Sequence, residues 1–154
     1  MTTLTASGAT LRPARTADLP AIERLLADSA LPLAGVSEAL ETFTVAEDGG
    51  DIVGVAGLEL CRGNALLRSV AITPEWRSRG LGRSLVTHVI ADAESRGLRA
   101  LYLLTTTADQ YFPSFGFRPI ARDEVPADVR ETEEFRSACP ASATVMTCPL
   151  AGRR

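Results

Sequence analysis

The first half of the chain contains short apolar runs typical of β-strands, interrupted by one helical pattern. Ile22, Leu25 and Leu26 follow the i, i+3, i+4 spacing of an amphipathic helix that extends to about Ala30, and a weaker helix is expected near 37–42. Strands are expected at 9–13, 43–47, 52–61 and 65–73. The Gly63-Asn64 pair predicts a tight turn between the last two, so the strands from 43 to 73 form an antiparallel meander.

After residue 80 the pattern changes to an alternation of helices and strands. Apolar residues lie at helical spacing from Leu81 to Arg96, and Gly97 ends this helix. The segments expected after it are a strand at 100–105, a short helix at 108–115, a strand at 117–121, a polar helix at 127–135 and a last strand near 143–148. A meander followed by a strand–helix–strand crossover predicts an α/β fold with a mixed sheet and helices on both faces.

Composition narrows the class of protein. With 154 residues, 45% of them hydrophobic and 23% charged, the chain suits one globular domain over 1–154. Its net charge of −3 argues against nucleic acid as the partner. All 16 basic residues are arginines, so neither a Schiff base nor a lysine general base is available.

Cysteine and histidine usage gives no metal centre. Cys61, Cys139 and Cys148 are too scattered for a disulfide framework or a zinc site, and His88 is the one histidine. The start of the sequence lacks a basic-then-apolar signal segment, and no apolar run approaches the roughly 18 residues of a membrane span. A cytoplasmic protein with reduced thiols and no membrane partner is expected.

The segment from Ser69 to Arg83 has the pattern of an anion-binding turn. A strand leads into a loop containing Gly80 and Gly82 and then directly into a helix, whose first N–H groups and positive dipole end favour phosphate. Three arginines, at positions 77, 79 and 83, add positive charge. The alternative is an ordinary glycine-rich turn with solvated arginines, because neither a Walker A loop nor a complete GxGxxG motif is present.

The run Arg77-x-x-Gly80-x-Gly82 on the first crossover resembles motif A of the GCN5-related N-acetyltransferase (GNAT) superfamily. The segments LRPARTADLPAIERLL, LLRSVAITPEWRSRGLGRSLV and LYLLTTTADQYFPSFGF resemble its successive blocks. The last block and the tail EFRSACPASATVM resemble the small arsenic-resistance N-acetyltransferases and the acetyltransferase domain of N-acetylglutamate synthase. The resemblance implies one domain with a core at about 9–122, an acceptor-site segment at 123–150, and a splayed fourth and fifth strand.

The resemblance also implies acetyl-CoA as co-substrate and assigns its binding residues. The backbone of Val70 and Ile72 would pair with the pantetheine arm, and the Val70 N–H would be the oxyanion donor. Phe112 replaces a tyrosine that serves many members as general acid, which leaves Tyr111 as the neighbouring candidate or a packed aromatic. The full cofactor set is Val70, Ile72, Arg77, Ser78, Arg79, Gly80, Leu81, Gly82, Arg83 and Phe112.

Acceptor residues come partly from the expected hairpin. A turn at Gly63-Asn64 sets Glu59 opposite Arg68, either as a plain cross-strand ion pair or as general base and carboxylate holder. The resemblance adds Arg136 and Ser142 near the acceptor's carboxylates, with Pro140 replacing an arginine of the synthase pattern. Thr105 and Thr106 end a strand beside the expected cleft, where they bond the acceptor or simply reflect β-propensity.

These assignments predict direct acetyl transfer to the amine of a small, anionic, amino-acid-like acceptor: an arsenical, a phosphinothricin-like compound or a glutamate-like compound. The alternatives are a non-catalytic CoA- or arsenical-binding module, to which Cys139 would contribute a thiolate, and an acetyltransferase of protein N-termini. The expected partners are the small-molecule acceptor and a second copy of the chain in a homodimer.

Overall fold

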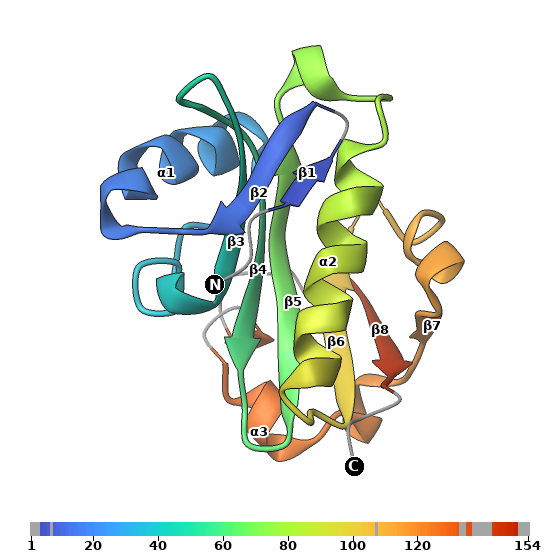
Figure 1. Cartoon of the computed structure of the whole chain (residues 1–154). Helices are drawn as coiled ribbons and strands as arrows, with labels where there is room; N and C mark the ends of the chain where they lie inside the picture. Colours follow the sequence, from blue (N-terminus) through green and yellow to red (C-terminus); the bar gives the residue numbers. More distant parts are fainter. Residues whose placement is uncertain (1–3, 7, 107, 133–134, 137–142, 151–154) are drawn as a thin grey trace. The chain divides into compact units, whose positions relative to one another are not determined.

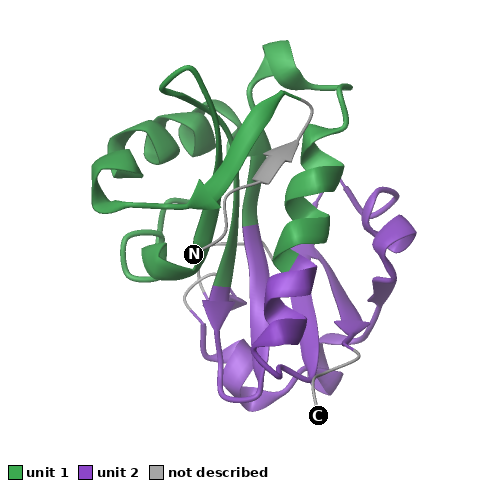
Figure 2. Cartoon of the chain, in the orientation of Figure 1, with its two compact units in different colours: residues 1–58, 69–89 green, residues 59–68, 90–154 purple. Residues whose placement is uncertain are grey.

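A computed structural model describes residues 4–6, 8–106, 108–132, 135–136 and 143–150. Over these residues the strands form an eight-stranded mixed sheet in the order β1-β2-β3-β4-β5-β6-β8-β7 (Figure 1). The chain divides into two compact units, one of Met1–Leu58 with Ser69–Val89 and one of Glu59–Arg68 with Ile90–Arg154 (Figure 2). Strands β4 (Asp51–Leu60) and β5 (Asn64–Ile72) each contribute to both units.

The first unit is an antiparallel meander with a helix packed on it. Strands β1 (Leu4–Ala6), β2 (Ala9–Pro13), β3 (Phe43–Asp48) and β4 pair in that order. Helix α1 (Leu19–Asp28) packs Ile22, Leu25 and Leu26 against Val45 and Val55 (Figure 1). The predicted apolar spacing is therefore confirmed as the buried side of α1.

Helix α2 (Leu81–Ser95) covers the opposite face of β4 in this unit. A Cβ atom at Gly54 would lie 2.9 Å from methyl carbons of Leu85 and Ile72, so Gly54 faces α2. Its neighbour Val55 faces α1, as the two-residue period of a strand requires. The expected placement of helices on both faces of the sheet is confirmed.

The second unit contains the one parallel pairing among the described strands. Strand β5 pairs in parallel with β6 (Ala100–Thr105) through three residue pairs, from Asn64–Ala100 to Leu66–Tyr102, although β5 continues to Ile72. This short pairing agrees with the expected splay. Strand β8 (Thr144–Pro149) lies antiparallel to β6, and β7 (Arg118–Pro119) pairs with β8. Helix α3 (Ala127–Arg130) contributes Val129 to a core with Leu66 and Val145.

Several expected elements are shorter in the structure. The polar helix expected at 127–135 ends as α3 at Arg130, because the Thr132 hydroxyl and N–H both donate to the Val129 carbonyl. The helix expected at 108–115 is a 3₁₀ turn, η4 (Phe112–Phe115), and the strand expected at 117–121 is only β7. Prolines 113 and 119 lack the N–H that longer elements would use.

Three further 3₁₀ turns, η1 (Thr16–Asp18), η3 (Pro74–Trp76) and η5 (Arg122–Glu124), lie in connections. The weak helix expected near 37–42 is also only a 3₁₀ turn, η2 (Leu40–Thr42). Strand β1 was not expected, since its three residues are too few to show a period.

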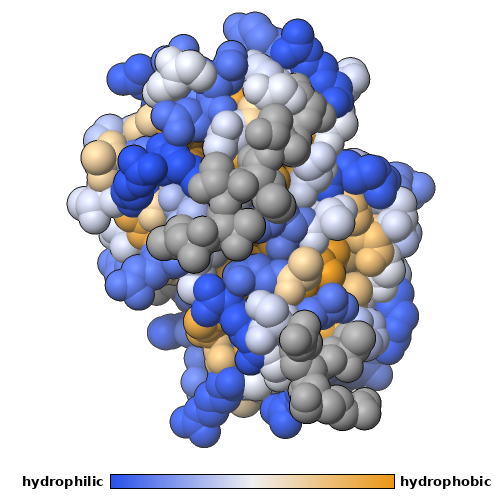
Figure 3. Space-filling view, in the orientation of Figure 1, coloured by the Kyte–Doolittle hydropathy of each residue, from blue (hydrophilic) through white to orange (hydrophobic). Residues whose placement is uncertain are grey.

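The face shown in Figure 3 is largely hydrophilic, with small hydrophobic areas between. Large apolar side chains exposed among the described residues are Leu33, Leu60 and Tyr111. No helix within the described ranges has both the length and the apolar character needed to cross a membrane.

Candidate active site

The turn between β5 and α2, in the first unit, has the backbone geometry of an anion site. Ser78 and Gly80 have φ angles of 65° and 85°, so left-handed residues flank Arg79. Such an alternation turns successive N–H groups toward the same side of the chain. Helix α2 begins at Leu81, directly after Gly80, and the first N–H groups of a helix have no partner within it. The turn therefore has the form that suits a phosphate group.

The three arginines of the turn have different contacts. Arg77 donates from Nε to the carbonyl oxygen of Ile72, at 3.0 Å, which ties it to the end of β5. The guanidinium of Arg79 stacks on the ring of Trp76, 4.6 Å from its centroid. Both arginines and Arg83 are exposed. They supply positive charge beside the turn in an otherwise acidic protein.

The end of β5 contains a second unusual backbone position. Ser69 is buried and has a φ of 60°, which interrupts the regular pleat of the strand. Val70 and Ile72, the expected partners of a pantetheine arm, follow it and are half-buried. The roles of Val70 and Ile72 toward a pantetheine arm stay a prediction.

Glu59 and Arg68, in the second unit, form an ion pair of 3.0 Å between Oε1 and Nη1. The Arg68 side chain is fully buried, and that of Glu59 is 20% exposed. The predicted pair is therefore present, and it is not a solvated surface pair. A carboxylate that combines a fixed orientation with solvent access suits a proton acceptor.

The turn of the hairpin that contains this pair lies one residue earlier in the chain than expected. The Cys61 N–H donates to the Asn64 carbonyl at 2.8 Å, so the turn residues are Arg62 and Gly63 rather than Gly63 and Asn64. Counting from that bond, Glu59 faces Leu66, and Arg68 is its diagonal neighbour two residues on. A shift of two residues keeps every side chain on the same face, and a long side chain reaches the diagonal position.

Three of the remaining expected acceptor residues, Thr105, Thr106 and Arg136, are among the described residues. Thr105 accepts a hydrogen bond from the Ala108 N–H at 2.8 Å, so its hydroxyl closes the loop after β6, and Thr106 is exposed. Arg136 is exposed. Ser142 and Pro140 lie outside the described residues, as does Cys139.

The aromatic pair has the orientation expected of neighbours on a turn. Phe112 is buried, 5.7 Å from Phe117 between ring centroids, whereas Tyr111 is 38% exposed and contacts the rings of Phe112 and Phe115. Phe112 is therefore a core residue in the position where a tyrosine would act. The role of Tyr111 as a general acid stays a prediction.

Neither described cysteine has the properties of a nucleophile. Burial, together with the charges of Asp128 and Glu59, raises the pKa of Cys61 to about 12. Burial likewise raises the pKa of Cys148. Both are therefore neutral thiols at pH 7. Across the described part of the chain no three His, Cys, Asp or Glu side chains are placed to hold a metal ion.

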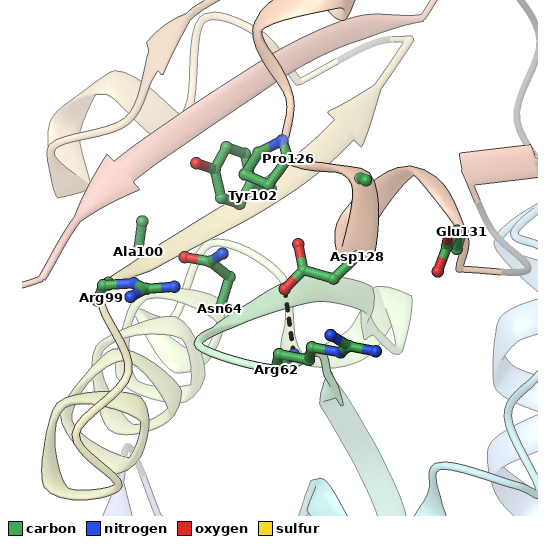
Figure 4. A pocket seen from close by; sticks show the side chains of 9 residues that line it. Arg62, Asn64, Arg99, Ala100, Tyr102, Pro126, Asp128 and Glu131 are labelled. Carbon is green, nitrogen blue, oxygen red and sulfur yellow. Dashed lines mark hydrogen bonds between the residues drawn. The ribbon is translucent and has the colours of Figure 1, made fainter.

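One polar cluster was missed in the sequence. Asn64, Arg99, Tyr102 and Asp128 line a pocket of the second unit (Figure 4). They come from three segments that are far apart in the chain: β5, the start of β6 and α3. Only the register of β5 with β6 brings the first three together.

The described part of the mixed sheet has one short parallel pairing, between β5 and β6. A glycine-containing turn joins β5 to α2, and a turn of this kind is typical of domains that bind a phosphorylated ligand at the end of a strand. The chain belongs to the acetyltransferase (GNAT) domain family, whose model matches residues 39–119, more than half of the 154 residues.

Three similar proteins extend the comparison. The chain is 30% identical to the amino-acid acetyltransferase of Neisseria meningitidis over 139 residues, 82% of this chain and 31% of that protein. The crystal structure of N-acetylglutamate synthase from Neisseria gonorrhoeae, complexed with coenzyme A and N-acetyl-glutamate, matches with a TM-score of 0.80 and 22% identity over 95% of this chain and 35% of that one. Rv2747 from Mycobacterium tuberculosis, in complex with CoA, matches with a TM-score of 0.77 and 27% identity over 91% of this chain and 98% of that one. The chain spans from about a fifth to about a third of the length of the first curated relatives it matches.

Proposed function

We propose that the protein is an acetyl-CoA-dependent N-acetyltransferase that acts on the amine of a small amino acid, with residues 1–154 as one functional domain. The turn from Ser78 to Gly82 carries this proposal, because two left-handed residues and a helix start together fit a pyrophosphate. The similarity to amino-acid acetyltransferases supports the choice of acceptor class. When bound, acetyl-CoA supplies an activated thioester.

The residues of this chain then have separate tasks. The N–H groups of the turn and the nearby arginines, Arg79 and Arg83, hold the pyrophosphate. The Val70 N–H stabilises the negative charge on the thioester oxygen. Glu59 accepts the proton of the acceptor's ammonium group, directly or through water, and Arg68, whose side chain is fully buried against Glu59, holds that carboxylate in position.

The reaction is balanced without an acyl-enzyme. The neutral amine attacks the thioester carbonyl carbon, a C–N bond forms, the C–S bond breaks, CoA leaves as a thiolate, and the nitrogen loses its extra proton to solvent. The reference pKa of a thiol is about 8.5, which makes the thiolate a fair leaving group without a proton donor. The core position of Phe112 is compatible with this path. The raised pKa of Cys61 argues against that thiol as a covalent relay.

The particular acceptor is also a proposal. An anionic amino acid is favoured by the exposed Arg136, and Pro140 in place of an arginine of the synthase pattern favours an analogue over glutamate itself. An arsenical or phosphinothricin-like amino acid satisfies both conditions, because each carries an acidic group of a different shape from a carboxylate.

The test is release of CoA thiol from acetyl-CoA in the presence of separate acceptors. L-glutamate, L-glutamine, phosphinothricin, an arsenical amino acid and a short peptide with a free N-terminus form the panel. We expect turnover with at least one anionic amino acid and less with the peptide. The single tryptophan, Trp76, stacks with Arg79 and reports acetyl-CoA binding by its fluorescence. Binding without turnover on any amine would overturn the enzyme and support a binding module.

A further inference from the structure

A second polar pocket lies in the second unit, beneath the turn that joins β4 to β5. Its volume is about 590 Å³, within the range of small-molecule sites. Ala100, Pro126 and Ala127 are its apolar lining residues. Six polar side chains line the rest: Arg62, Asn64, Arg99, Tyr102, Asp128 and Glu131. None of them belongs to the acetyl-transfer machinery proposed above.

The Asn64 side chain offers this pocket a polar group. Asn64 is only 5% exposed, and it is one of the residues that line the pocket. In Figure 4 the amide lies between the guanidinium of Arg99 and the carboxylate of Asp128. A nearly buried amide is favourable only when it is hydrogen-bonded, so water in the pocket, or a ligand that replaces it, serves as its partner.

The carboxylate beside Asn64 is held in place by backbone N–H groups, and the main chain of Arg99 is tied to the neighbouring turn. Asp128 accepts from the Arg62 N–H at 3.1 Å and from the Val129 N–H at 2.9 Å, which fixes both carboxylate oxygens. The main-chain N–H of Arg99 donates to the Gly63 carbonyl at 2.8 Å, and its main-chain carbonyl accepts from the Leu150 N–H at 2.9 Å. A Cβ atom at Gly63 would lie 2.5 Å from Nη2 of Arg99, so glycine is what allows the guanidinium to lie over the turn.

The described charged side chains around the pocket form no ion pairs with one another. The described residues contain no ion pair that uses Arg62, Arg99, Asp128 or Glu131, although all four line the same pocket. Two cations and two anions around one cavity exclude a simple phosphate, which the carboxylates repel, and a lone cation, which the arginines repel. A ligand that carries one charge of each sign satisfies both sides.

We propose that this pocket binds a zwitterionic α-amino acid, with its carboxylate on Arg99 and the Asn64 amide and its ammonium group on Asp128. This site is separate from the acceptor site proposed at Glu59 and Arg68. Asn64 and Arg68 are four residues apart on β5, which corresponds to about 13 Å along a strand. The chain therefore holds two amino acids, one for reaction and one for binding.

Isothermal titration calorimetry of the full chain tests the proposal with L-glutamate, L-leucine and L-arginine, each also as its N-acetyl and its amide derivative. The free amino acids should bind more tightly than derivatives that lack either charge. Arg99→Gln and Asp128→Asn should each weaken binding at least tenfold. Asp128→Asn retains an oxygen for the Arg62 N–H, so the turn is preserved. Arg130→Gln and Asp123→Asn remove exposed charges outside the pocket and should change nothing.

Glu59→Gln separates this site from the acceptor site, and acetyl transfer is measured in parallel. Binding that is lost in Glu59→Gln but kept in Arg99→Gln would place the amino acid only at the acceptor site and overturn the proposal. Absence of binding by all three free amino acids, or equal binding of the N-acetyl and amide forms, would also overturn it. If a pocket variant does not fold, the NMR shift of the Asn64 side-chain amide in the unaltered protein decides: a shift on titration supports the site, and a constant signal refutes it. Acetyl transfer with no amino acid at this pocket would leave the proposed function standing.

Discussion

Replacement of Glu59 by glutamine tests the proposed proton acceptor with the smallest change in shape. Glu59 contacts the fully buried guanidinium of Arg68 at 3.0 Å, and its remaining 20% exposure gives a proton a path to solvent. Glutamine keeps an oxygen that can accept from Arg68 but has no negative charge and no basic site. The variant therefore separates the structural part of the pair from its chemical part.

The structural cost follows from the burial of the pair. Removing one partner of a buried ion pair costs about 3–5 kcal/mol, because the other charge is left uncompensated. A glutamine still accepts one hydrogen bond from Arg68, and a hydrogen bond to a charged group contributes about 2 kcal/mol. We therefore expect the free energy of unfolding to fall by only about 2 kcal/mol. For a domain of this size that lowers Tm by about 4–8 °C, and the protein stays folded at assay temperature.

The chemical cost is measured as the pH profile of kcat/KM for an amino-acid acceptor. Loss of a general base should lower kcat/KM by about 100-fold or more at the pH where the acceptor arrives as ammonium. The deficit should shrink as the pH rises, because more acceptor then arrives as neutral amine. The exposed Glu41→Gln serves as the control and should match the wild type. A loss that is constant across pH would make Glu59 a positioning residue, and an unchanged rate would remove it from the reaction.

Three further changes test other parts of the structure. Asp18→Asn should lower the free energy of unfolding at neutral pH by about 3 kcal/mol, because Asp18 binds Arg12 through bonds of 2.8 and 2.9 Å. The hydrogen bond from Arg12 holds the pKa of the Asp18 carboxyl below its ordinary value of 3.8. The stability that Asp18 contributes is therefore complete above pH 3.8 and is lost as the pH falls through the lower pKa of the folded state. Urea titrations of the wild type and the variant should converge only at that low pH. Gly57→Ala should cost about 1–3 kcal/mol, since a Cβ atom would collide with the buried ring of Phe43, and an unchanged Tm would mean that this ring can move away. Arg79→Ala should weaken CoA binding about tenfold in calorimetry through loss of one charge-assisted contact, and equal affinity would exclude this arginine from the phosphate site.

Local signals in the sequence predicted the elements that the chain forms by itself. The helix expected from Leu81 to Arg96 is α2 to within one residue, and the strand expected at 100–105 is β6. Both are long enough to show a period in their apolar residues. Their placement follows from local spacing and from the glycine that ends α2.

Contacts between distant segments explain what the sequence did not predict. Either Arg62-Gly63 or Gly63-Asn64 can form a two-residue turn. The structure has the turn at Arg62-Gly63, in which the Arg62 N–H donates to Asp128, 66 residues away in the sequence. The pocket residues have the same origin, because Asn64 meets Ala100 through sheet register. Neither the position of the turn nor the set of pocket residues follows from the local sequence of any one segment.

Backbone strain links the two ends of the proposed cofactor site. Within the described ranges the non-glycine residues with positive φ are Ala30, Ser69 and Ser78. Ala30 follows the end of α1, where a left-handed residue is common. The two serines instead flank the end of β5 and the start of the turn, where the left-handed conformation costs each about 1–2 kcal/mol and glycine would avoid it. Such outliers cluster at ligand-binding sites. Two of them within ten residues, in a family that transfers acetyl groups, support the assignment of the segment from Ser69 to Gly82 to acetyl-CoA more strongly than the two glycines of the motif do by themselves.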